Sequence, residues 1–214
     1  MKYRAIVFDM DGTLLNTLDD IADSANYILH KYEYPQKTLE DVRMAVGNGA
    51  RMLMKALLPD GEQTPDFERI LEDYGAYYRD HCQIKTRPYE GVPELLQRLR
   101  NAGIKTAIVS NKGDAAVKAL NLQYFGERIN IAIGEREGIR RKPEPDSVLA
   151  ALKELDCPRK CALYVGDSEV DRATAANAGM DCMLVSWGFR GRKQLERLQA
   201  AYLIDSPEEL LRLL

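Results

Sequence analysis

Ala5-Ile6-Val7-Phe8-Asp9-Met10-Asp11-Gly12-Thr13 is an apolar run that leads into two closely spaced aspartates. Its apolar first half predicts a buried strand. Asp9 and Asp11 follow directly, and two carboxylates this close repel each other, more strongly when they are partly buried. Mg²⁺ would remove that repulsion, because hard divalent cations bind carboxylate oxygens. Gly12-Thr13 would turn the chain and offer backbone N–H groups to an anion, so the stretch indicates phosphoryl chemistry unless Asp-Gly is merely a turn.

The composition is that of an ordinary globular protein. The chain has 214 residues, 45% of them hydrophobic and 29% charged, with a formal net charge of −3. This balance predicts no nucleic-acid partner, and no apolar run approaches the ~18 residues of a membrane helix. Acidic residues begin at Asp9, which leaves no room for the apolar segment of a signal peptide. The spacing of the four cysteines fits neither a zinc site nor a C-x-x-C pair, so we expect reduced thiols in a cytoplasmic protein.

The pattern of helices and strands divides the chain into two parts. Residues 15 to about 86 show helical periodicity and no convincing strand, whereas helices alternate with short apolar strands from residue 91. Such alternation predicts a parallel sheet covered on both faces. We therefore expect an α/β protein with a Rossmann-like, doubly wound parallel sheet in residues 1–14 and 88–214, and an inserted α-helical cap domain in residues 15–87. The predicted helices are 17–33 (capped by Thr17), 39–46, 50–58, 67–82, 92–102, 114–122, 146–155, 169–178 and 207–213, and the predicted strands after the first are 104–109, 129–133, 162–165, 182–185 and 201–204.

Polar residues gather where the predicted strands end. Ser110-Asn111-Lys112 follow the second strand, residues 140–143 lie in the loop after the third, and residues 166–171 follow the fourth. Ligands of such sheets bind beyond the carboxyl ends of the strands. Each signal has a simpler explanation, since Ser110 alone is more often a helix cap and Lys142 alone a solvated charge. Together they predict one site with two carboxylate clusters, a hydroxyl and a lysine.

These strand ends carry four motifs in order: Asp9-Met10-Asp11-Gly12-Thr13, Ser110, Lys142-Pro143 and Gly166-Asp167-Ser168-x-x-Asp171. The set resembles the four motifs of the haloacid dehalogenase superfamily, and the helical insertion resembles that family's small cap. The resemblance covers essentially the whole chain. It implies a Mg²⁺-dependent phosphatase that acts on a small phosphorylated metabolite, as a monomer or homodimer, without a nucleic-acid or membrane partner.

The resemblance also implies roles for individual residues. Asp9 would attack phosphorus and form an aspartyl-phosphate, while Asp11 would donate a proton to the leaving group and later accept one from water. Mg²⁺ would be held by the carboxylates of Asp9 and Asp167 and by the backbone carbonyl of Asp11. The remaining implied residues are Ser110 and Lys142 as catalytic groups, the backbone N–H groups of Gly12 and Asn111 as substrate contacts, and Asp171 behind the metal ligands.

Shorter strings resemble the phosphoglycolate phosphatase branch of the superfamily: residues 46–49, 141–145 and 186–189. The branch suggests 2-phosphoglycolate as the substrate. A helix that starts near Asn48 and Gly49 would offer N–H groups and a positive dipole end to the substrate carboxylate, with Arg51 or Arg43 nearby. A plain turn between helices explains the same residues equally well. Relatives usually carry Asp-Ser where this chain has Asn16-Thr17, which leaves the substrate open.

Other functions also fit the resemblance. Pyrophosphatases, sugar-phosphate phosphatases and phosphomutases belong to the same superfamily, although residues 18–21 lack the His that mutases usually carry, and a phosphonate hydrolase would replace Asp11. A catalytically silent phosphate-binding regulatory protein would typically have lost one of the four charged motif residues, and all four are present. Unrelated phosphate chemistries lack their motifs, because no Gly-Lys pair forms a P-loop and no Arg stands six positions after a Cys.

Overall fold

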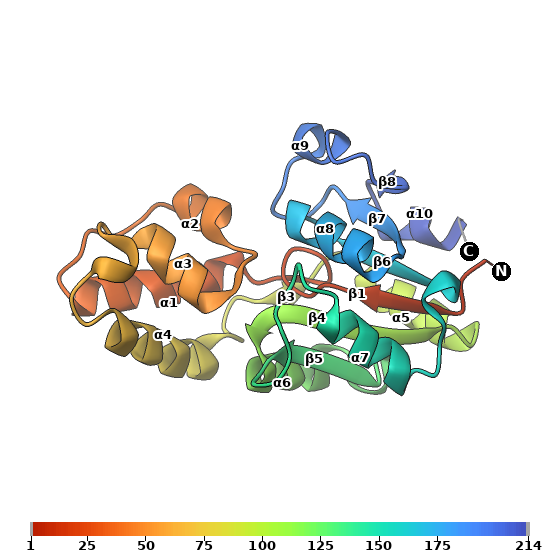
Figure 1. Cartoon of the computed structure of the whole chain (residues 1–214), viewed down its shortest axis with the longest axis horizontal. Coiled ribbons are helices and arrows are strands. Elements are labelled where there is room, and N and C mark those ends of the chain that lie inside the picture. The colour runs from red at the N-terminus through yellow and green to blue at the C-terminus, as the bar shows by residue number, and fades with distance from the viewer. Residues whose placement is uncertain (1, 213–214) are drawn as a thin grey trace. The chain divides into compact units, whose positions relative to one another are not determined.

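The computed structural model describes residues 2–212, which form two compact units. One unit comprises residues 2–16 and 88–212 and contains a six-stranded sheet, and the other comprises Thr17–Arg87 and is helical (Figure 1). The strands of the large sheet are β1 (Ala5–Phe8), β4 (Lys105–Gly113), β5 (Ile131–Glu135), β6 (Ala162–Gly166), β7 (Asp181–Val185) and β8 (Tyr202–Ile204).

The six strands are parallel and lie in the order β5-β4-β1-β6-β7-β8. The four residues of β1 are apolar and buried, as expected for a central strand of a sheet that is covered on both faces. The strands that follow β1 in the sequence are placed first on one side of it and then, from β6 onward, on the other. The predicted α/β class with a Rossmann-like, doubly wound parallel sheet is therefore confirmed.

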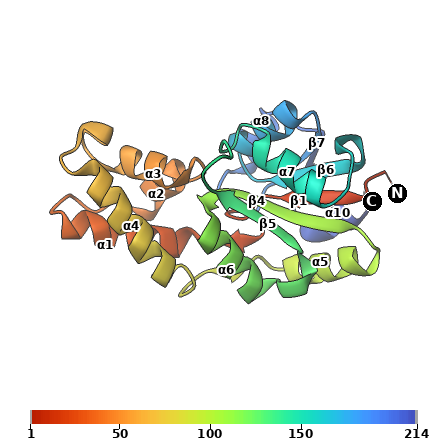
Figure 2. The same ribbon diagram turned by 60° about the horizontal axis from the view of Figure 1, so that its bottom comes forward.

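Helices cover both faces of this sheet (Figure 2). Helices α7 (Asp146–Glu154) and α8 (Glu169–Ala178) pack on one face, where their apolar residues join those of alternate strand positions in the core. The opposite side carries α5 (Val92–Asn101), α6 (Asp114–Tyr124) and α10 (Pro207–Arg212). A short helix, α9 (Arg192–Glu196), lies between β7 and β8 in the sequence, and the short 3₁₀ helices of this unit are Gly126–Arg128 and Arg159–Cys161.

The register of the central strands places the end of β1 beside the last part of β4 and the end of β6. Phe8 of β1 is paired with Ile108 of β4 on one side and with Val165 of β6 on the other. The next residues along these three strands therefore lie at one edge of the sheet. Because β1 stands between the two halves of the sheet, this edge is the topological switch point at which open α/β sheets bind their ligands.

The second unit is built from α1 (Leu18–Lys31), α2 (Leu39–Ala45), α3 (Gly49–Leu57) and α4 (Phe67–His81), with a 3₁₀ helix at Gly61–Gln63. Its chain enters and leaves beside a two-stranded ladder of β2 (Leu15–Asn16) and β3 (Arg87–Pro88). Asp20 is buried and accepts hydrogen bonds from the backbone N–H groups of Lys85 and Thr86. One carboxylate in the first turn of α1 thus fixes the last residues of the unit.

The structure corrects the predicted end of the second strand of the large sheet. β4 was expected to end at residue 109 but runs through Ser110 to Gly113, because it continues to pair with β5 after a register irregularity between Val109 and Gly113. Ser110, Asn111 and Lys112 therefore lie within the irregular end of a strand. β5 starts two residues later than predicted, because residues 129 and 130 connect the 3₁₀ helix Gly126–Arg128 to the strand.

Three smaller features of the structure differ from the prediction for local reasons. The pairing of β2 with β3 spans two residues, which is too short to leave a pattern in the sequence. α9 is a single polar turn without apolar periodicity and was not predicted. Thr17 is the N-cap residue of α1, but its side chain does not accept the expected capping hydrogen bond. Other helix ends differ by one or two residues, which is usual for fraying ends, and residue 213 of the last predicted helix lies outside the described residues.

Candidate active site

Asp9 lies directly beyond β1 at the switch point of the sheet. Its backbone N–H donates to Val165 O at 2.8 Å, which ties the residue to β6. Lys142 reaches it from the loop before α7, with Nζ 2.8 Å from Asp9 Oδ1. Both residues are buried, at 7% exposure for Asp9 and 2% for Lys142. An ion pair with this geometry is a strong, charge-assisted hydrogen bond, so the ammonium fixes the position of the Asp9 carboxylate.

Asp171 is the second carboxylate on the Lys142 ammonium, and both of its oxygens are occupied. Oδ1 accepts from Lys142 Nζ and from the Tyr164 hydroxyl, each at 2.9 Å. Oδ2 accepts from the backbone N–H groups of Asp167 and Ser168 and from the Ser168 hydroxyl, at 3.2, 3.1 and 2.6 Å. Burial by itself raises the pKa of Asp171, but the Lys142 charge and these hydrogen bonds outweigh it and lower that pKa. Asp171 is therefore an ionised anchor at the start of α8.

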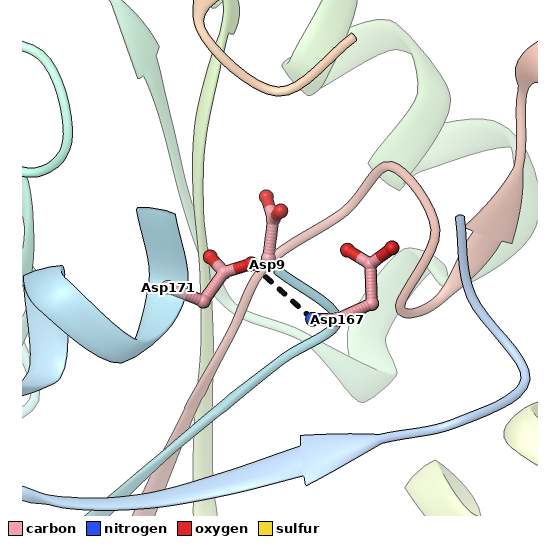
Figure 3. A group of neighbouring side chains, drawn as sticks. All are labelled: Asp9, Asp167 and Asp171. Atoms are coloured by element: carbon pink, nitrogen blue, oxygen red, sulfur yellow. Dashed lines mark hydrogen bonds between the residues drawn. The ribbon is translucent and has the colours of Figure 1, made fainter. Parts of the chain in front are cut away.

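Asp9, Asp167 and Asp171 direct their carboxylates to the same side of the site (Figure 3). Each offers an oxygen within 4.8 Å of the others. Burial raises the pKa of Asp9 to about 7, because Lys142 only partly offsets it and the charges of Asp171 and Asp11 add to it. Burial also raises the pKa of Asp167 well above its ordinary value, and Asp171 and Asp9 add to the shift. The site thus holds more negative charge than its lysines balance.

A hard divalent cation such as Mg²⁺ fits this donor set, because it would relieve the excess charge through carboxylate oxygens. The acidic cluster is the one of its kind that the structure shows among residues 2–212. Asp171 is a poor ligand within it, since its two oxygens already accept five hydrogen bonds. Asp9 and Asp167 are therefore the carboxylates with room for a metal, and Asp171 holds the groups around them.

The Asp167 carboxylate is enclosed by two glycines and a backbone donor. The Phe189 N–H donates to Asp167 Oδ2 at 2.6 Å. A Cβ on Gly12, whose φ is +81°, would lie 2.3 Å from that oxygen, and a Cβ on Gly188 would lie 2.5 Å from it. Neither distance is possible for real atoms, so both positions require glycine if Asp167 is to keep its place. Gly12 thus has a steric role in addition to the substrate contact expected from the sequence.

The segment 186–190 after β7 joins the site through side chains as well. Trp187 Nε1 donates to Thr13 O at 3.0 Å and so connects the segment with the turn that follows β1. Arg190 is 3% exposed, and its guanidinium donates to both carboxylate oxygens of Glu169 at 3.1 and 3.2 Å. In the sequence this segment stood out only through its resemblance to one branch of a superfamily. In the structure this segment holds Asp167 through the Phe189 N–H.

Asp11 is held by two residues of β4. Lys112 Nζ lies 3.0 Å from Asp11 Oδ1, and the two side chains are 7% and 13% exposed. Ser110 Oγ donates to Asp11 Oδ2 at 3.5 Å and accepts from the Lys112 N–H at 3.2 Å. Ser110 therefore lies beside Asp11 and does not cap a helix. No role for Lys112 was predicted from the sequence, although residues i and i+2 of a strand share a face and Ser110 is a candidate.

Asn111 supports Lys142 through its side chain. Its Nδ2 donates to Lys142 O at 3.0 Å, and its Oδ1 accepts from the Lys142 N–H at 2.8 Å. This pair of bonds fixes the backbone from which the Lys142 side chain extends. The sequence predicts only a contact through the backbone N–H of Asn111, and the spacing of the motifs gives no signal for this role of the side chain.

Of the candidate residues of the helical unit, Arg51 pairs with residues of that unit. Asn48 is the N-cap residue of α3 but makes no capping hydrogen bond with its side chain, and Gly49 starts the helix with a φ of +81°. Arg51 donates to Glu68 at 2.6 Å, and its guanidinium lies 5.3 Å from the centre of the Phe67 ring. The guanidinium of Arg51 is thus committed to an exposed ion pair.

Comparisons with known proteins agree with this geometry. The family model for haloacid dehalogenase-like hydrolases matches residues 6–185, and the chain belongs to this family. A crystal structure from Lactobacillus delbrueckii subsp. bulgaricus that carries the provisional name of a phosphoglycolate phosphatase is 38% identical. It superposes with a TM-score of 0.93 over 98% of this chain and 97% of that one.

Two curated relatives have different names. N-acetylmuramic acid 6-phosphate phosphatase from Pseudomonas aeruginosa is 28% identical over 99% of this chain and 94% of its own length. Pyrophosphatase PpaX from Bacillus thuringiensis is 31% identical over 100% of this chain and 97% of its own length. The chain is thus an enzyme, a phosphatase of the haloacid dehalogenase-like family, and the predicted family and enzyme class are confirmed.

Two further expectations concern membrane-spanning helices and the state of the cysteines. Within residues 2–212, none of the helices combines the length and the apolar character that crossing a membrane requires. Cys82, Cys157, Cys161 and Cys182 are free thiols.

Proposed function

We propose that this phosphatase hydrolyses phosphate monoesters with the help of Mg²⁺, through a phosphoryl group carried transiently on Asp9. The observation that carries the proposal is the buried ion pair of Asp9 with Lys142 at the switch point of the sheet. A carboxylate with a neighbouring ammonium and an anion-binding turn has what an in-line attack on phosphorus requires.

Asp9 and Asp11 would divide the chemistry between them. An Asp9 oxygen forms a bond to phosphorus while the bond from phosphorus to the leaving oxygen breaks, and the Asp11 carboxyl gives its proton to that oxygen. Asp11 then takes a proton from a water molecule whose oxygen attacks phosphorus, and the bond to Asp9 breaks. Lys112 holds Asp11 for both transfers.

The remaining residues would bind and orient the phosphoryl group. Lys142 offsets charge beside Asp9, and the backbone N–H groups of Gly12 and Asn111 and the Ser110 hydroxyl are the proposed donors to phosphoryl oxygens. Asp9, Asp167 and the backbone carbonyl of Asp11 would hold Mg²⁺. When bound, the metal neutralises the two anions that must approach each other.

2-Phosphoglycolate is the substrate we propose. Its support is the 38% identity to the Lactobacillus delbrueckii structure with the provisional phosphoglycolate phosphatase name. The carboxylate of 2-phosphoglycolate would also need a cationic partner or several N–H donors. Asn48, Gly49 and Arg51 of the helical unit stay the proposed contacts, although Arg51 would first have to leave Glu68.

Inorganic pyrophosphate is the second candidate substrate. The pyrophosphatase PpaX relatives at 31% identity over the whole chain favour it. It replaces the substrate carboxylate by a second phosphate, so the same Asp9 chemistry applies to a leaving group that needs less help from Asp11. We further propose that the enzyme works in the cytoplasm, which suits four free thiols.

The test is kcat/KM for phosphate release over one panel with Mg²⁺ and again with EDTA. The panel holds 2-phosphoglycolate, pyrophosphate, a muramic acid phosphate, several sugar phosphates and p-nitrophenyl phosphate. A preference of about 100-fold for phosphoglycolate, which is about 2.7 kcal/mol of transition-state discrimination, supports the first candidate. A preference of the same size for pyrophosphate supports the second candidate substrate. Release that is unaffected by EDTA contradicts the metal dependence.

A further inference from the structure

Tyr164 lies beneath the candidate active site without belonging to any of its motifs. It is the third residue of β6, two positions before Gly166, and its side chain is fully buried at 0% exposure. Its hydroxyl accepts from Lys142 Nζ at 3.1 Å and donates to Asp171 Oδ1 at 2.9 Å. The hydroxyl therefore sits between the ammonium that contacts Asp9 and the carboxylate that anchors this ammonium.

The Lys142 ammonium uses all of its donors within this cluster. An ammonium carries three N–H donors and no acceptor. Its three partners are Asp9 Oδ1 at 2.8 Å, Asp171 Oδ1 at 2.9 Å and the Tyr164 hydroxyl at 3.1 Å. The Tyr164 and Asp171 oxygens lie on the same side of the ammonium, because they are 2.9 Å apart, and Asp9 is its third acceptor.

The direction of the tyrosine hydrogen bonds follows from the same chemistry. Because the ammonium cannot accept, the hydroxyl proton must go to Asp171 and its lone pair must face Lys142. Burial raises the pKa of Tyr164 well above its ordinary value, and the charges of Asp171 and Asp9 add to the shift, so the hydroxyl keeps the proton that it donates.

We propose that Tyr164 is a positioning residue for catalysis, which fixes the Lys142 ammonium so that one of its N–H groups holds the Asp9 carboxylate in line with phosphorus. The inference rests on the proposed function in one respect, namely that Asp9 is the attacking group. Tyr164 acts through Lys142 and does not touch the substrate.

Loss of the hydroxyl would leave one N–H of a buried ammonium without an acceptor. A buried unsatisfied charged donor is costly, so the ammonium would shift toward its two carboxylates and draw Asp9 with it. The chemical step depends on the angle and distance of attack, whereas substrate binding uses other groups. The change should therefore appear in kcat and leave KM nearly unaltered.

Tyr164→Phe tests this inference, with Tyr3→Phe as the matched control. Tyr3 is also a buried tyrosine whose hydroxyl donates to an aspartate, Asp181, at 2.6 Å, but it precedes β1 and lies far from the carboxyl edge of the sheet. We expect kcat of Tyr164→Phe to fall about 10- to 100-fold, the usual effect of losing an outer partner of a catalytic group. KM should stay within about twofold of wild type, because uniform binding is untouched. Tyr3→Phe should keep both values.

A double substitution separates positioning from a general loss of structure. If Tyr164 acts through Lys142, then Tyr164→Phe should reduce kcat no further in a protein that already carries Lys142→Met. Independent losses that multiply would overturn the inference. Should Tyr164→Phe fail to fold, 3-fluorotyrosine at position 164 keeps the ring and the hydroxyl but weakens the acceptor, and a smaller fall in kcat is expected there.

The outcomes for this inference and for the proposed function are distinct. A wild-type enzyme that releases no phosphate from any compound of the panel contradicts the proposed function and removes the basis of the positioning role. An active wild-type enzyme with an unchanged kcat in Tyr164→Phe, or in the fluorotyrosine protein, overturns the positioning role alone. A rise in KM with unchanged kcat would also overturn it, because that result places Tyr164 in substrate binding.

Discussion

Lys112 Nζ lies 3.0 Å from Asp11 Oδ1, and both side chains are nearly buried. The residue that would transfer protons is therefore held by an ammonium from the neighbouring strand, with Ser110 on its other oxygen. A fixed carboxyl can reach the leaving oxygen without a search among rotamers, and this is the geometric condition for general acid catalysis. The position of the Asp11 carboxyl group therefore depends on Lys112.

Lys112→Met should therefore harm poor leaving groups most. A substrate with an alkoxide leaving group needs the Asp11 proton, whereas p-nitrophenolate leaves without it. We expect kcat/KM for 2-phosphoglycolate to fall about 100-fold, in the range of general acid catalysis, and that for p-nitrophenyl phosphate to fall far less. Lys118→Met removes a lysine paired with Asp114 on α6 and serves as the control. Equal losses for both substrates would contradict the role given to Lys112.

Gly188→Ala should weaken Mg²⁺ binding. The new methyl group would lie 2.3 Å from Gly12 O, 2.4 Å from Asp167 Cβ and 2.5 Å from Asp167 Oδ2, so this proposed metal ligand must move. We expect the Mg²⁺ dissociation constant to rise about 10- to 100-fold, as for other changes behind metal ligands. Trp187 is the single tryptophan of the chain and is bonded to Thr13 O, so its fluorescence can report the titration without turnover.

Gly191→Ala is the control for that experiment, because a Cβ at Gly191 meets nothing within 4 Å. Its Mg²⁺ affinity should equal that of the wild type. An unchanged affinity in Gly188→Ala would mean that Asp167 does not bind the metal.

The stability of the metal-free protein should fall as the pH rises from about 4 to about 7. The pKa of Asp9 is raised from 3.8 to about 7 in the folded state. Between these values the folded protein keeps a proton that the unfolded chain has released, so raising the pH favours unfolding. The raised pKa of Asp167 acts in the same direction.

Denaturant unfolding in EDTA at several pH values measures this effect. Asp9→Asn should make the free energy of unfolding less dependent on pH across the same window, and Mg²⁺ should restore stability most strongly near neutral pH. If the free energy of unfolding of Asp9→Asn changed with pH as steeply as that of the wild type, the inference that the metal-free site holds excess negative charge would be wrong.

The fold and the positions of the motifs could be predicted from the sequence, but most of the contacts between the motifs could not. The apolar run before Asp9 and the alternation after residue 91 predict the parallel sheet, because burial on both faces leaves continuous apolar strands. Residues at strand ends were predictable in the same way, since a parallel sheet brings its carboxyl ends to one edge.

Contacts that cross between motifs could not be predicted. Tyr164 looked like any residue of an apolar strand, and its hydroxyl matters only because Lys142 and Asp171 reach it from segments 22 and 7 residues away. Phe189 acts through its backbone N–H, which leaves no trace in residue type. The irregular end of β4 depends on its pairing with β5, so the apolar pattern in the sequence stops before Ser110.

The most direct test of the account is to trap the phosphoryl group on the enzyme. Asp11→Asn slows the water attack, and p-nitrophenyl phosphate still phosphorylates this variant because its leaving group needs no proton. The variant is mixed with p-nitrophenyl phosphate and Mg²⁺, quenched in acid, digested and examined by mass spectrometry. The aspartyl-phosphate mechanism predicts a covalent phosphoryl group on the peptide that contains Asp9, and none when Asp9→Asn is added. Phosphate release by the wild type with no phosphoryl group on Asp9, or with one on another residue, would contradict it.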